Sequence, residues 1–456
     1  MPSEAALRRI LFPLTGAIVL AWFFFFTWKS VGFYFDNDDM MNLYLAWSKP
    51  LTEVYRPLGA VFYRVLYAFA GFNPLPFRIA CLAIGVANVG LCWWFTRLVS
   101  GSDRVAALAI LLFAFHTRLM EIWWRTGVVY DLLCFTFFYL AVCLYIDARK
   151  AGGVPEIVRS AAILLCCLCA LGAKENALAL PVVLLAYEVL FHGFAWKNLW
   201  RGGVLALLGI PYLWFKMHGA NAISSNPAYM PEYTLAHFLG AWSRFLGYLL
   251  VLDHNVQPWQ AACILLGMLG AAAVTRSPKL TLAWMVLFFA TLPVAFIPYR
   301  GAYVLYTAYP GAVLYVATML VAAQDFLTRI RPRYRTALAC AVFLLVGWRW
   351  GKLNLHDQRA DARPWLHQSE AQVRAMADQM RVLEPSLPKG ARILFTEDAF
   401  STDEWTPYFV IKLLYHDDTQ WVDRVKMMDK KPASWNDYQY VFGFQGGRYE
   451  RLKGAP

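Results

Sequence analysis

Long apolar blocks separated by short polar connections occupy most of this 456-residue chain. The blocks have about 17 to 24 residues each, and a helix needs roughly 20 apolar residues to cross the hydrocarbon core of a bilayer. One of the most apolar stretches, "IVLAWFFFFTW" at 18–28, is followed closely by the acidic segment "YFDNDDMMNLY" at 34–44. The pattern predicts a mainly α-helical, polytopic membrane protein.

Lys and Arg residues in the connections orient these helices, because short positively charged loops remain in the cytoplasm. With Arg8 and Arg9 inside, the first helix runs outward, and a long outer loop carries the acidic segment and extends to about residue 74. About eleven spanning helices are predicted, and they cover residues 9–28, 75–98, 104–121, 127–146, 159–173, 176–192, 203–217, 259–275, 280–297, 303–324 and 334–350.

One apolar segment, residues 235–253, does not fit this alternation of spans. Counting it as a span would place the arginine-rich run "RIRPRYR" at 329–335 on the outer side. We therefore expect an interfacial or re-entrant helix there, and a C-terminus on the outer side.

The composition becomes mixed and polar after residue 355. The stretch "RILFTED" at 392–398 predicts a short strand, between helical patterns at 364–383 and 407–415. About 100 residues suffice for a small folded domain. We therefore divide the chain into a membrane domain at 1–354 and a small extracytoplasmic α/β domain at 355–456.

Composition agrees with membrane insertion and argues against nucleic-acid binding. The chain is 59% hydrophobic and only 16% charged, whereas soluble globular proteins carry about 25% charged residues. Its net charge of +12 lies largely in the short connections, where basic residues determine topology. The expected environment is thus the lipid bilayer, with no nucleic-acid partner.

The acidic segment is the first candidate site, because a carboxylate at the edge of a bilayer is costly unless it is paired, hydrated or metal-bound. Asp38 and Asp39 directly precede the helical pattern "MMNLYLAW", so they are better positioned than Asp36. Such a pair can deprotonate an acceptor hydroxyl or hold a divalent cation such as Mg²⁺ or Mn²⁺, and the spacing permits either. The alternative is a solvated helix end.

Basic residues on the same predicted side are candidates for binding a phosphate. Arg56 in "VYRPLGAVFYR" precedes a rigid proline, and an arginine fork can bind two phosphate oxygens at once. Arg64 in the same stretch is equally explained as an arginine that snorkels to the interface. Arg300 in "FIPYRGAYVLYTAYPG" lies close to Tyr303, which belongs to an aromatic belt of the kind common at membrane interfaces.

Two further candidates lie at outer helix ends. Asp131 in "WWRTGVVYDLLCF" begins an inward helix, either as a stabilising N-terminal anion or as a second active-site carboxylate. Lys174 and Glu175 in "LGAKENALAL" occupy a tight outer turn. They either cap that turn or, in the case of the lysine, hold an anionic head group.

All these groups fall on one predicted side of the membrane, beside hydrocarbon. Acids and cations together at that face fit a lipid that carries a phosphate, and a polyprenyl-phosphate sugar matches this description. Its phosphate is the leaving group of a sugar transfer, so cations that neutralise the growing charge favour the transition state. An aspartate would activate the incoming hydroxyl of the acceptor.

At these residues the chain resembles the GT-C superfamily of integral-membrane glycosyltransferases. The likeness is to the membrane part of the transmembrane and TPR-containing O-mannosyltransferases and to bacterial enzymes that use polyprenyl-phosphate sugars. It covers roughly residues 8–325. The matching stretches, in order, are "FDNDD", "YRPLGAVFYRVLYAFAGFNPLPFRIACLAIGVAN", "YDLLCFTFFYLAVCLY", "AKENALALPVVLLAYE" and "PYRGAYVLYTAYPG".

The resemblance implies an inverting transfer of sugar from a polyprenyl phosphate, with an acid of "DNDD" as the general base. Asp38, Asp39 and Asp131 would be catalytic, and Arg56, Lys174 and Arg300 would bind the donor phosphate. Asp36, Glu175 and Tyr303 would support them. Members of the superfamily differ in their need for a metal.

The chain also departs from that group. Arg78 stands where the group usually has a histidine, and no TPR array follows the membrane part. Protein O-mannosylation is therefore not carried over, and the acceptor is an envelope glycan, lipid or protein. Small size and short loops favour a bacterial inner-membrane enzyme whose site faces the periplasm.

Two other classes compete with this interpretation. A transporter or flippase of lipid-linked or anionic substrates should show internal repeats and ions near the midplane of the membrane, and the sequence shows neither. An acyl- or phosphotransferase should show a histidine-centred motif outside. The histidines of the chain, among them His116, His218, His237 and His254, are scattered without such a pattern.

Overall fold

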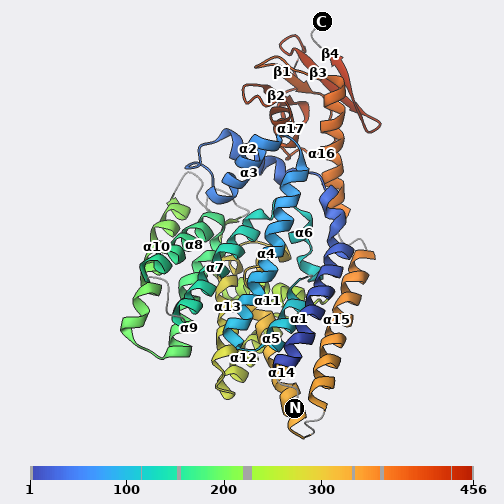
Figure 1. The fold of residues 1–456 in the computed structure, drawn as a ribbon. Helices are drawn as coiled ribbons and strands as arrows, with labels where there is room; N and C mark the ends of the chain where they lie inside the picture. The colour runs from blue at the N-terminus through green and yellow to red at the C-terminus, as the bar shows by residue number, and fades with distance from the viewer. Residues whose placement is uncertain are drawn as a thin grey trace. The chain divides into compact units, whose positions relative to one another are not determined.

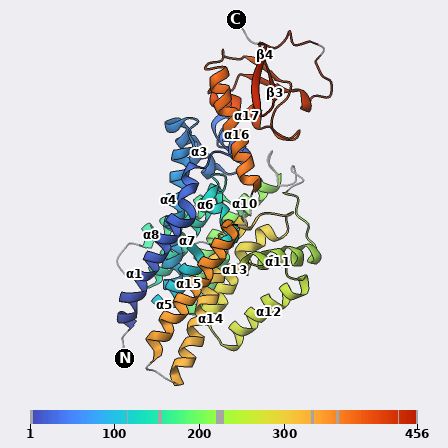
Figure 2. The ribbon, with the colours of Figure 1, turned by 90° about the vertical axis from the view of Figure 1, so that its right-hand side faces the viewer.

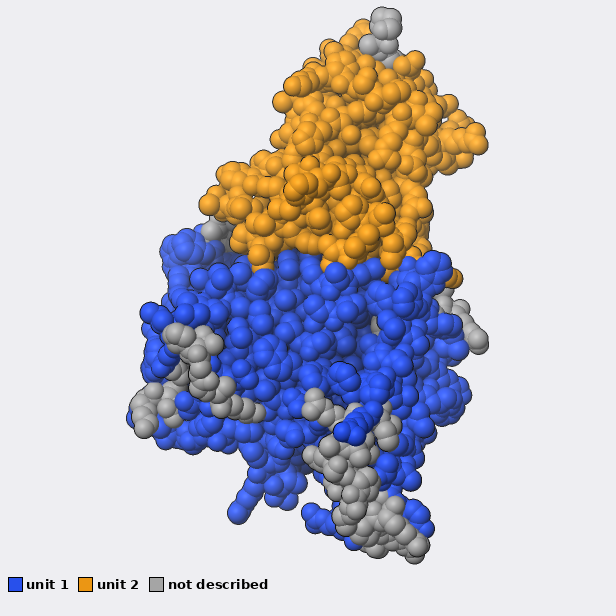
Figure 3. Space-filling view, in the orientation of Figure 1, with its two compact units in different colours: residues 1–28, 81–124, 128–360 blue, residues 29–80, 125–127, 361–456 orange. Residues whose placement is uncertain are grey.

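The computed structural model describes residues 4–114, 116–150, 156–218, 229–330, 334–359, 364–432 and 434–453. The chain divides into two compact units, coloured separately in Figure 3. Unit 1 comprises residues 1–28, 81–124 and 128–360, and unit 2 comprises residues 29–80, 125–127 and 361–456. The domain boundary expected near residue 355 stays a prediction, but the structure groups the C-terminal residues with the first outer segment.

Unit 1 is helical throughout its described part. Its helices are α1 (Glu4–Trp22), most of α4 (Pro74–Ser100), α5 (Asp103–Ala114), α6 (Glu121–Trp124), α7 (Val129–Lys150), α8 (Glu156–Ala173), α9 (Leu180–His192), α10 (Trp196–His218), α11 (Leu235–Leu249), α12 (Pro258–Val274), α13 (Pro278–Ala295), α14 (Tyr309–Ile330) and α15 (Arg335–Arg359). Figure 1 shows them as a bundle.

Eight helical stretches among the described residues are long and apolar enough to cross a membrane. They are Leu11–Gly32, Pro74–Ser100, Val129–Arg149, Glu156–Ala173, Glu175–His192, Pro278–Ala295, Tyr309–Arg329 and Thr336–His356. Each overlaps a predicted span. The predicted spans at 104–121, 203–217 and 259–275 are not among them, so the structure supports eight of the predicted spans by length and composition.

Several predicted boundaries differ from the observed ones. The helix predicted to begin at 303 begins at Tyr309, after a 3₁₀ turn over Ala302–Leu305. The helix predicted at 104–121 ends at Ala114, seven residues short of the predicted end. Residues 303–308 before Tyr309 are mostly apolar, so hydropathy alone does not locate the start of that helix. After Ala114 the predicted span included the polar residues 116–118, where the helix does not continue. The basic residues at 331–333 lie outside the described residues.

The core of unit 1 lies around α5 and α13. Helix α5 contacts α1, α14 and α15, and all but one of its apolar side chains are buried. Helix α13 contacts α9, α12 and α14. Gly311 permits the close approach of α14 to α13, because a Cβ there would lie 2.6 Å from the Ala283 carbonyl oxygen.

Unit 2 joins the first outer segment to the C-terminal residues. The segment predicted as a long outer connection contains two helices. Helix α2 (Asn37–Ser48) confirms the helical pattern predicted after Asp39, whereas α3 (Pro57–Ala70) was not predicted. The 14 residues of α3 are mostly apolar, with Arg64 the single charged residue, and they are fewer than a spanning helix needs. The predicted helical pattern at 364–383 is confirmed as α16 (Pro364–Leu383).

The C-terminal sheet has four strands in the order β2-β1-β3-β4. The strands are β1 (Arg392–Phe395), β2 (Trp421–Arg424), β3 (Tyr440–Gln445) and β4 (Arg448–Lys453). Strand β1 pairs in parallel with β2 and β3, and β4 pairs antiparallel with β3. Gly446 and Gly447 form the β3–β4 turn with φ of 58° and 80°, values that a two-residue hairpin turn requires and glycine adopts most easily.

The helices of the C-terminal part connect the sheet to α2. Helix α16 contacts β4, and Figure 2 labels both. Helix α17 (Thr406–Leu414) contacts β2. Both helices also contact α2. The Tyr44 hydroxyl donates to Asp418 Oδ1 at 2.6 Å, and the Tyr67 hydroxyl donates to the Leu413 carbonyl oxygen at 2.6 Å. The first outer segment and the C-terminal residues therefore fold as one body.

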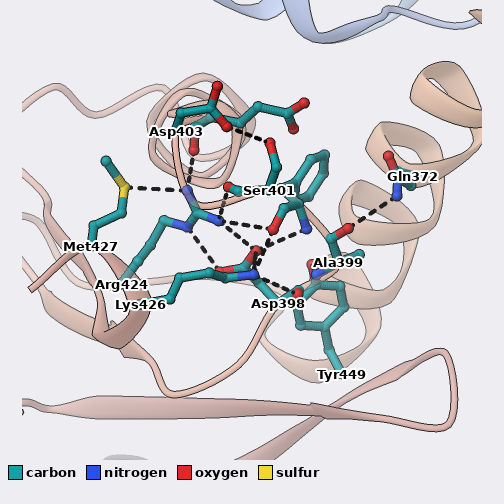
Figure 4. A network of polar contacts seen from close by, with 11 residues as sticks. Gln372, Asp398, Ala399, Ser401, Asp403, Arg424, Lys426, Met427 and Tyr449 are labelled. Atoms are coloured by element: carbon teal, nitrogen blue, oxygen red, sulfur yellow. Dashed lines mark hydrogen bonds and ion pairs between the residues drawn. The ribbon is translucent and has the colours of Figure 1, made fainter. Parts of the chain in front are cut away.

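A buried ion cluster joins the last residue of β2, Arg424, to Asp398 in the loop that follows β1 (Figure 4). Arg424 donates from Nε and Nη2 to the two carboxylate oxygens of Asp398 at 2.8 and 2.7 Å. Lys426 Nζ lies 2.9 Å from Asp398 Oδ1 and donates to the carbonyl oxygen of Phe400 at 2.5 Å. The cluster holds the 398–404 loop against β2 and satisfies the charges that it buries.

Candidate active site

The acidic segment begins helix α2. Asp36 is the N-cap residue, and its Oδ1 accepts a hydrogen bond from the backbone N–H of Asp39 at 3.0 Å. Asp39 Oδ2 accepts in return from the backbone N–H of Asp36 at 3.1 Å. This reciprocal capping box satisfies two backbone donors that a helix start leaves unpaired. Asp38 lies between them, in the first turn of α2.

Arg125 binds two of the three acids. Its Nε donates to Asp36 Oδ2 at 2.7 Å, and its Nη2 donates to Asp38 Oδ2 at 2.5 Å. The side chains of Arg125 and Asp36 are 8% and 2% exposed, whereas that of Asp38 is 64% exposed. Of Asp36 and Asp38, Asp38 therefore has the exposed carboxylate, while Asp36 is buried beneath the guanidinium.

Asp39 is fully buried. Its Oδ1 accepts from the Tyr63 hydroxyl at 3.2 Å. Burial raises the pKa of Asp39 well above its ordinary value, and the neighbouring Asp36 carboxylate raises it further, against the opposing charges of Arg125 and Arg78. Asp39 is thus better suited to stabilising the start of α2 than to acting as a general base on a substrate.

Helix α16 fixes the backbone that leads into the acids. Glu370 Oε1 accepts from the backbone N–H of Tyr34 at 3.0 Å, and Ser369 Oγ accepts from that of Asn37 at 3.2 Å. Arg374 donates to the Gly32 carbonyl oxygen at 2.7 Å. Each contact joins residues more than 300 positions apart in the chain, so the C-terminal helix positions the acidic segment.

A second cluster lies in unit 1. Lys174 Nζ lies 2.5 Å from Asp131 Oδ1, and the two side chains are only 5% and 4% exposed. The ammonium is also 5.0 Å from the centroid of the Tyr303 ring. Of the residues predicted from the sequence, the structure therefore brings these three together. Asp131 is the charge partner of the lysine.

The remaining predicted residues occupy separate positions within their own units. In unit 1, Glu175 lies 3.6 Å from Lys216, and the Arg300 guanidinium lies 3.9 Å from the centroid of the Tyr229 ring. In unit 2, Arg56 is the N-cap residue of α3. The nearby Arg64 has a structural role. The position of Arg64 in the sequence did not decide its role. Arg64 donates to the carbonyl oxygens of Ala46 and Lys49 and so caps the end of α2.

A divalent cation does not fit the acidic segment as it is arranged. Among the residues that the structure describes, no three His, Cys, Asp or Glu side chains are grouped so as to hold a metal ion. The oxygens of Asp36 and Asp39 all accept hydrogen bonds, and Oδ2 of Asp38 accepts from Arg125. A metal bound by Asp38 and Asp39, as the spacing permits, would have to displace these donors.

Arg125 was not predicted as a site residue, although it lies in the stretch "WWRTGVVYDLLCF". A signal was present, since an arginine beside an apolar segment needs a partner. Tyr63 was not predicted either, because it carries no charge and lies within a mostly apolar helix. Arg78, noted as a departure from the family pattern, is fully buried and donates from Nε to the Ser30 carbonyl oxygen at 3.1 Å.

Comparisons with known proteins give fold-level matches. No protein-family model matches the sequence, and no curated protein matches it. ArnT from Cupriavidus metallidurans bound to undecaprenyl phosphate is 14% identical with a TM-score of 0.51, over 94% of this chain and 92% of ArnT. Its apo structure is 15% identical with a TM-score of 0.55, over 97% and 93%.

An oligosaccharyltransferase from Archaeoglobus fulgidus in complex with Zn and sulfate is 13% identical with a TM-score of 0.54, over 95% of this chain and 67% of that one. These likenesses confirm the predicted fold. The chain has a mainly α-helical, polytopic membrane fold similar to that of ArnT and of the oligosaccharyltransferase, with a small C-terminal sheet.

Proposed function

We propose that this chain is a glycosyltransferase that moves a sugar from a polyprenyl-phosphate donor to an acceptor hydroxyl at the membrane surface. The fold supports this class, since the similar ArnT was solved with undecaprenyl phosphate and the other similar enzyme transfers oligosaccharides. Unit 2 supports it with the exposed carboxylate of Asp38, and unit 1 by itself supports it with the buried ammonium of Lys174. The acceptor is an envelope glycan, lipid or protein, and the site faces the periplasm of a bacterial inner membrane.

Asp38 is the proposed general base, and its exposure is the observation that carries the proposal. A base must reach the proton that it removes, and the Asp38 side chain is 64% exposed whereas Asp39 is buried. Asp38 takes the proton of the acceptor hydroxyl as the oxygen attacks the anomeric carbon of the donor. The bond from that carbon to the phosphate oxygen breaks with inversion, and polyprenyl phosphate leaves.

Cations stabilise the leaving phosphate as its charge grows. Lys174, Arg300 and Arg56 are the proposed ligands of that phosphate. Lys174 is held by Asp131 and lies near Tyr303, so its ammonium has a fixed position. Asp131 acts in this proposal by orienting the lysine, and Glu175 supports the same turn. Asp36 and Asp39 hold the start of α2, on which Asp38 lies.

Turnover in a reconstituted membrane tests this function. The full chain in liposomes receives a panel of polyprenyl-phosphate sugars together with an envelope extract as the acceptor source. Release of free polyprenyl phosphate is measured by mass spectrometry, and movement of the donor between leaflets is measured in parallel. The proposal predicts release with at least one donor. Movement of donor between leaflets with no release would replace the proposal by a flippase.

A further inference from the structure

We propose that Arg125 is the resident cation of the acidic segment, and that Asp36 and Asp38 consequently bind no divalent metal ion. The geometry within unit 2 carries this inference, and it rests on the proposed function only for the role of Asp38 as the base. One guanidinium spans both carboxylates, with Nε on Asp36 at 2.7 Å and Nη2 on Asp38 at 2.5 Å.

The guanidinium has the features of a permanent partner. An arginine keeps its charge throughout the accessible pH range, and its planar fork carries several donors in fixed directions. Here the side chain is 8% exposed, and the carboxylate of Asp36 beneath it is 2% exposed. Buried charge pairs persist because removal of one partner leaves the other uncompensated. A hydrated cation entering from solution would meet this cost when it displaced Arg125.

The oxygen atoms needed by a metal are otherwise engaged. Mg²⁺ requires close to octahedral coordination by oxygen, and protein carboxylates supply one or two of those ligands. Both oxygens of Asp36 and both oxygens of Asp39 accept hydrogen bonds, from Arg125, Tyr63 and the backbone of the capping box. A metal on these acids would therefore disrupt the start of α2 as well as the arginine pair.

The backbone next to Arg125 lies close to the acids, and a glycine permits this close approach. A Cβ on Gly127 would lie 3.2 Å from Asp39 Oδ1, 3.8 Å from Asp38 Cβ and 4.0 Å from Arg125 Nη2. Contacts of 3.2 Å to a Cβ are tight, so glycine allows residues 125–127 to lie against the acids. Residues 125–127 thus pack directly on the acidic segment and bring Arg125 to its carboxylates.

Arg125 is accordingly a positioning residue. It binds Oδ2 of Asp38. The other oxygen of that carboxylate then accepts the proton from the acceptor hydroxyl. A base whose orientation is set by a charged neighbour is better placed than one on a free side chain. The same bond supplies positive charge at the acids, which in other acid-rich sites comes from a metal ion.

Binding of Mn²⁺ tests the inference without any glycosyl transfer. Electron paramagnetic resonance measures Mn²⁺ bound to the full chain in lipid nanodiscs, for the wild type, Asp38→Asn and Arg125→Gln. The wild type is expected to show no bound Mn²⁺ that depends on Asp38. Arg125→Gln frees Asp36 and Asp38, so it should gain Mn²⁺ binding that the wild type lacks, and adding Asp38→Asn should abolish that binding.

Arg424→Gln is the matched control, because Arg424 also binds a buried aspartate with two nitrogens, at 2.8 and 2.7 Å. Asp398 stays bound by Lys426, and the nearby Asp403 in Figure 4 accepts a hydrogen bond from Ser401, so this variant should gain no Mn²⁺ site. Wild-type Mn²⁺ binding that is lost in Asp38→Asn overturns the inference. So does a folded Arg125→Gln that binds no more Mn²⁺ than the control.

Catalysis gives a second readout once a donor is known. Turnover of the wild type should be unchanged by EDTA, and turnover of Arg125→Ala should be partly restored by millimolar guanidinium, which refills the vacated position. Loss of wild-type turnover on EDTA treatment with recovery on Mn²⁺ addition overturns the inference and leaves the proposed function intact. If Arg125→Gln does not fold, the wild-type Mn²⁺ and EDTA measurements decide the matter alone.

Discussion

Removal of the buried Lys174–Asp131 pair separates its structural role from its proposed role in phosphate binding. Three variants are needed: Lys174→Met, Asp131→Leu and the combination of the two. Both side chains are almost fully buried, and Nζ lies 2.5 Å from Oδ1. Each single variant leaves one charge buried without its main partner.

The expected magnitudes follow from that burial. Loss of one member of a buried ion pair typically costs about 3–5 kcal/mol, whereas replacing both by apolar residues of similar volume is often close to neutral. The single variants should therefore unfold at clearly lower temperature, and the double variant should recover most of the wild-type stability. Turnover should not recover, because loss of one group that stabilises the transition-state charge costs about 10²–10³-fold.

Thermal unfolding in nanodiscs gives the stability, and release of polyprenyl phosphate gives the turnover. Arg104→Met with Asp325→Leu is a suitable control pair, since these residues also form an ion pair in unit 1, at 2.9 Å, and are not proposed to touch the donor. A stable double variant at Lys174 and Asp131 with wild-type turnover would refute the assignment of Lys174 to the phosphate.

Two further predictions concern the start of α2. Burial and the Asp36 carboxylate raise the pKa of Asp39, so the folded state keeps a proton that the unfolded chain releases above about pH 4. The contribution of protonated Asp39 to the free energy of unfolding is complete at low pH, and it declines as the pH rises toward the pKa of Asp39 in the folded state. Between pH 5 and 8 the Tm of the wild type should therefore fall more than that of Asp39→Asn. Thermal unfolding with equal slopes of Tm against pH for the two proteins would contradict the raised pKa of Asp39. Gly127→Ala places a Cβ 3.2 Å from Asp39 Oδ1. We expect it to lower turnover by about tenfold, because small displacements of catalytic groups are costly, with little change in donor affinity measured by quenching of tryptophan fluorescence.

The bundle was predictable from the sequence wherever one long apolar block makes one helix. The blocks that became α4, α7 and α13 are continuous, and their helices lie within a few residues of the predicted spans. Prediction failed where an apolar chain breaks its helix, as it does before Tyr309. It also failed in the first outer segment, where the helix α3 contains Arg64 and was interpreted as a loop.

The C-terminal sheet was only partly predictable. Strand β1 carries the apolar pattern "RILF" and was expected. Strand β4, "RYERLK", is an edge strand with mostly exposed side chains, so its composition resembles that of a polar loop. Its pairing with β3 depends on the Gly446–Gly447 turn, a signal that a search for hairpins would have found.

The candidate site shows the limit of local patterns more clearly. The spacing of Asp36 and Asp39 is local, and it alone fixes the capping box. Arg125, the partner of both Asp36 and Asp38, lies 87 positions from Asp38. No periodicity joins residues at that separation in one sequence. Glu370, more than 330 positions from the backbone that it binds, was out of reach for the same reason.

A comparison of Asp38→Asn with Asp39→Asn under single-turnover conditions tests the central claim most directly. Both variants are supplied with a polyprenyl-phosphate sugar that the wild type consumes, and donor binding is measured separately from sugar transfer. The account predicts that Asp38→Asn binds the donor normally and loses about 10²-fold or more in the rate of transfer, while Asp39→Asn loses far less. Wild-type transfer by Asp38→Asn would contradict the assignment of the general base.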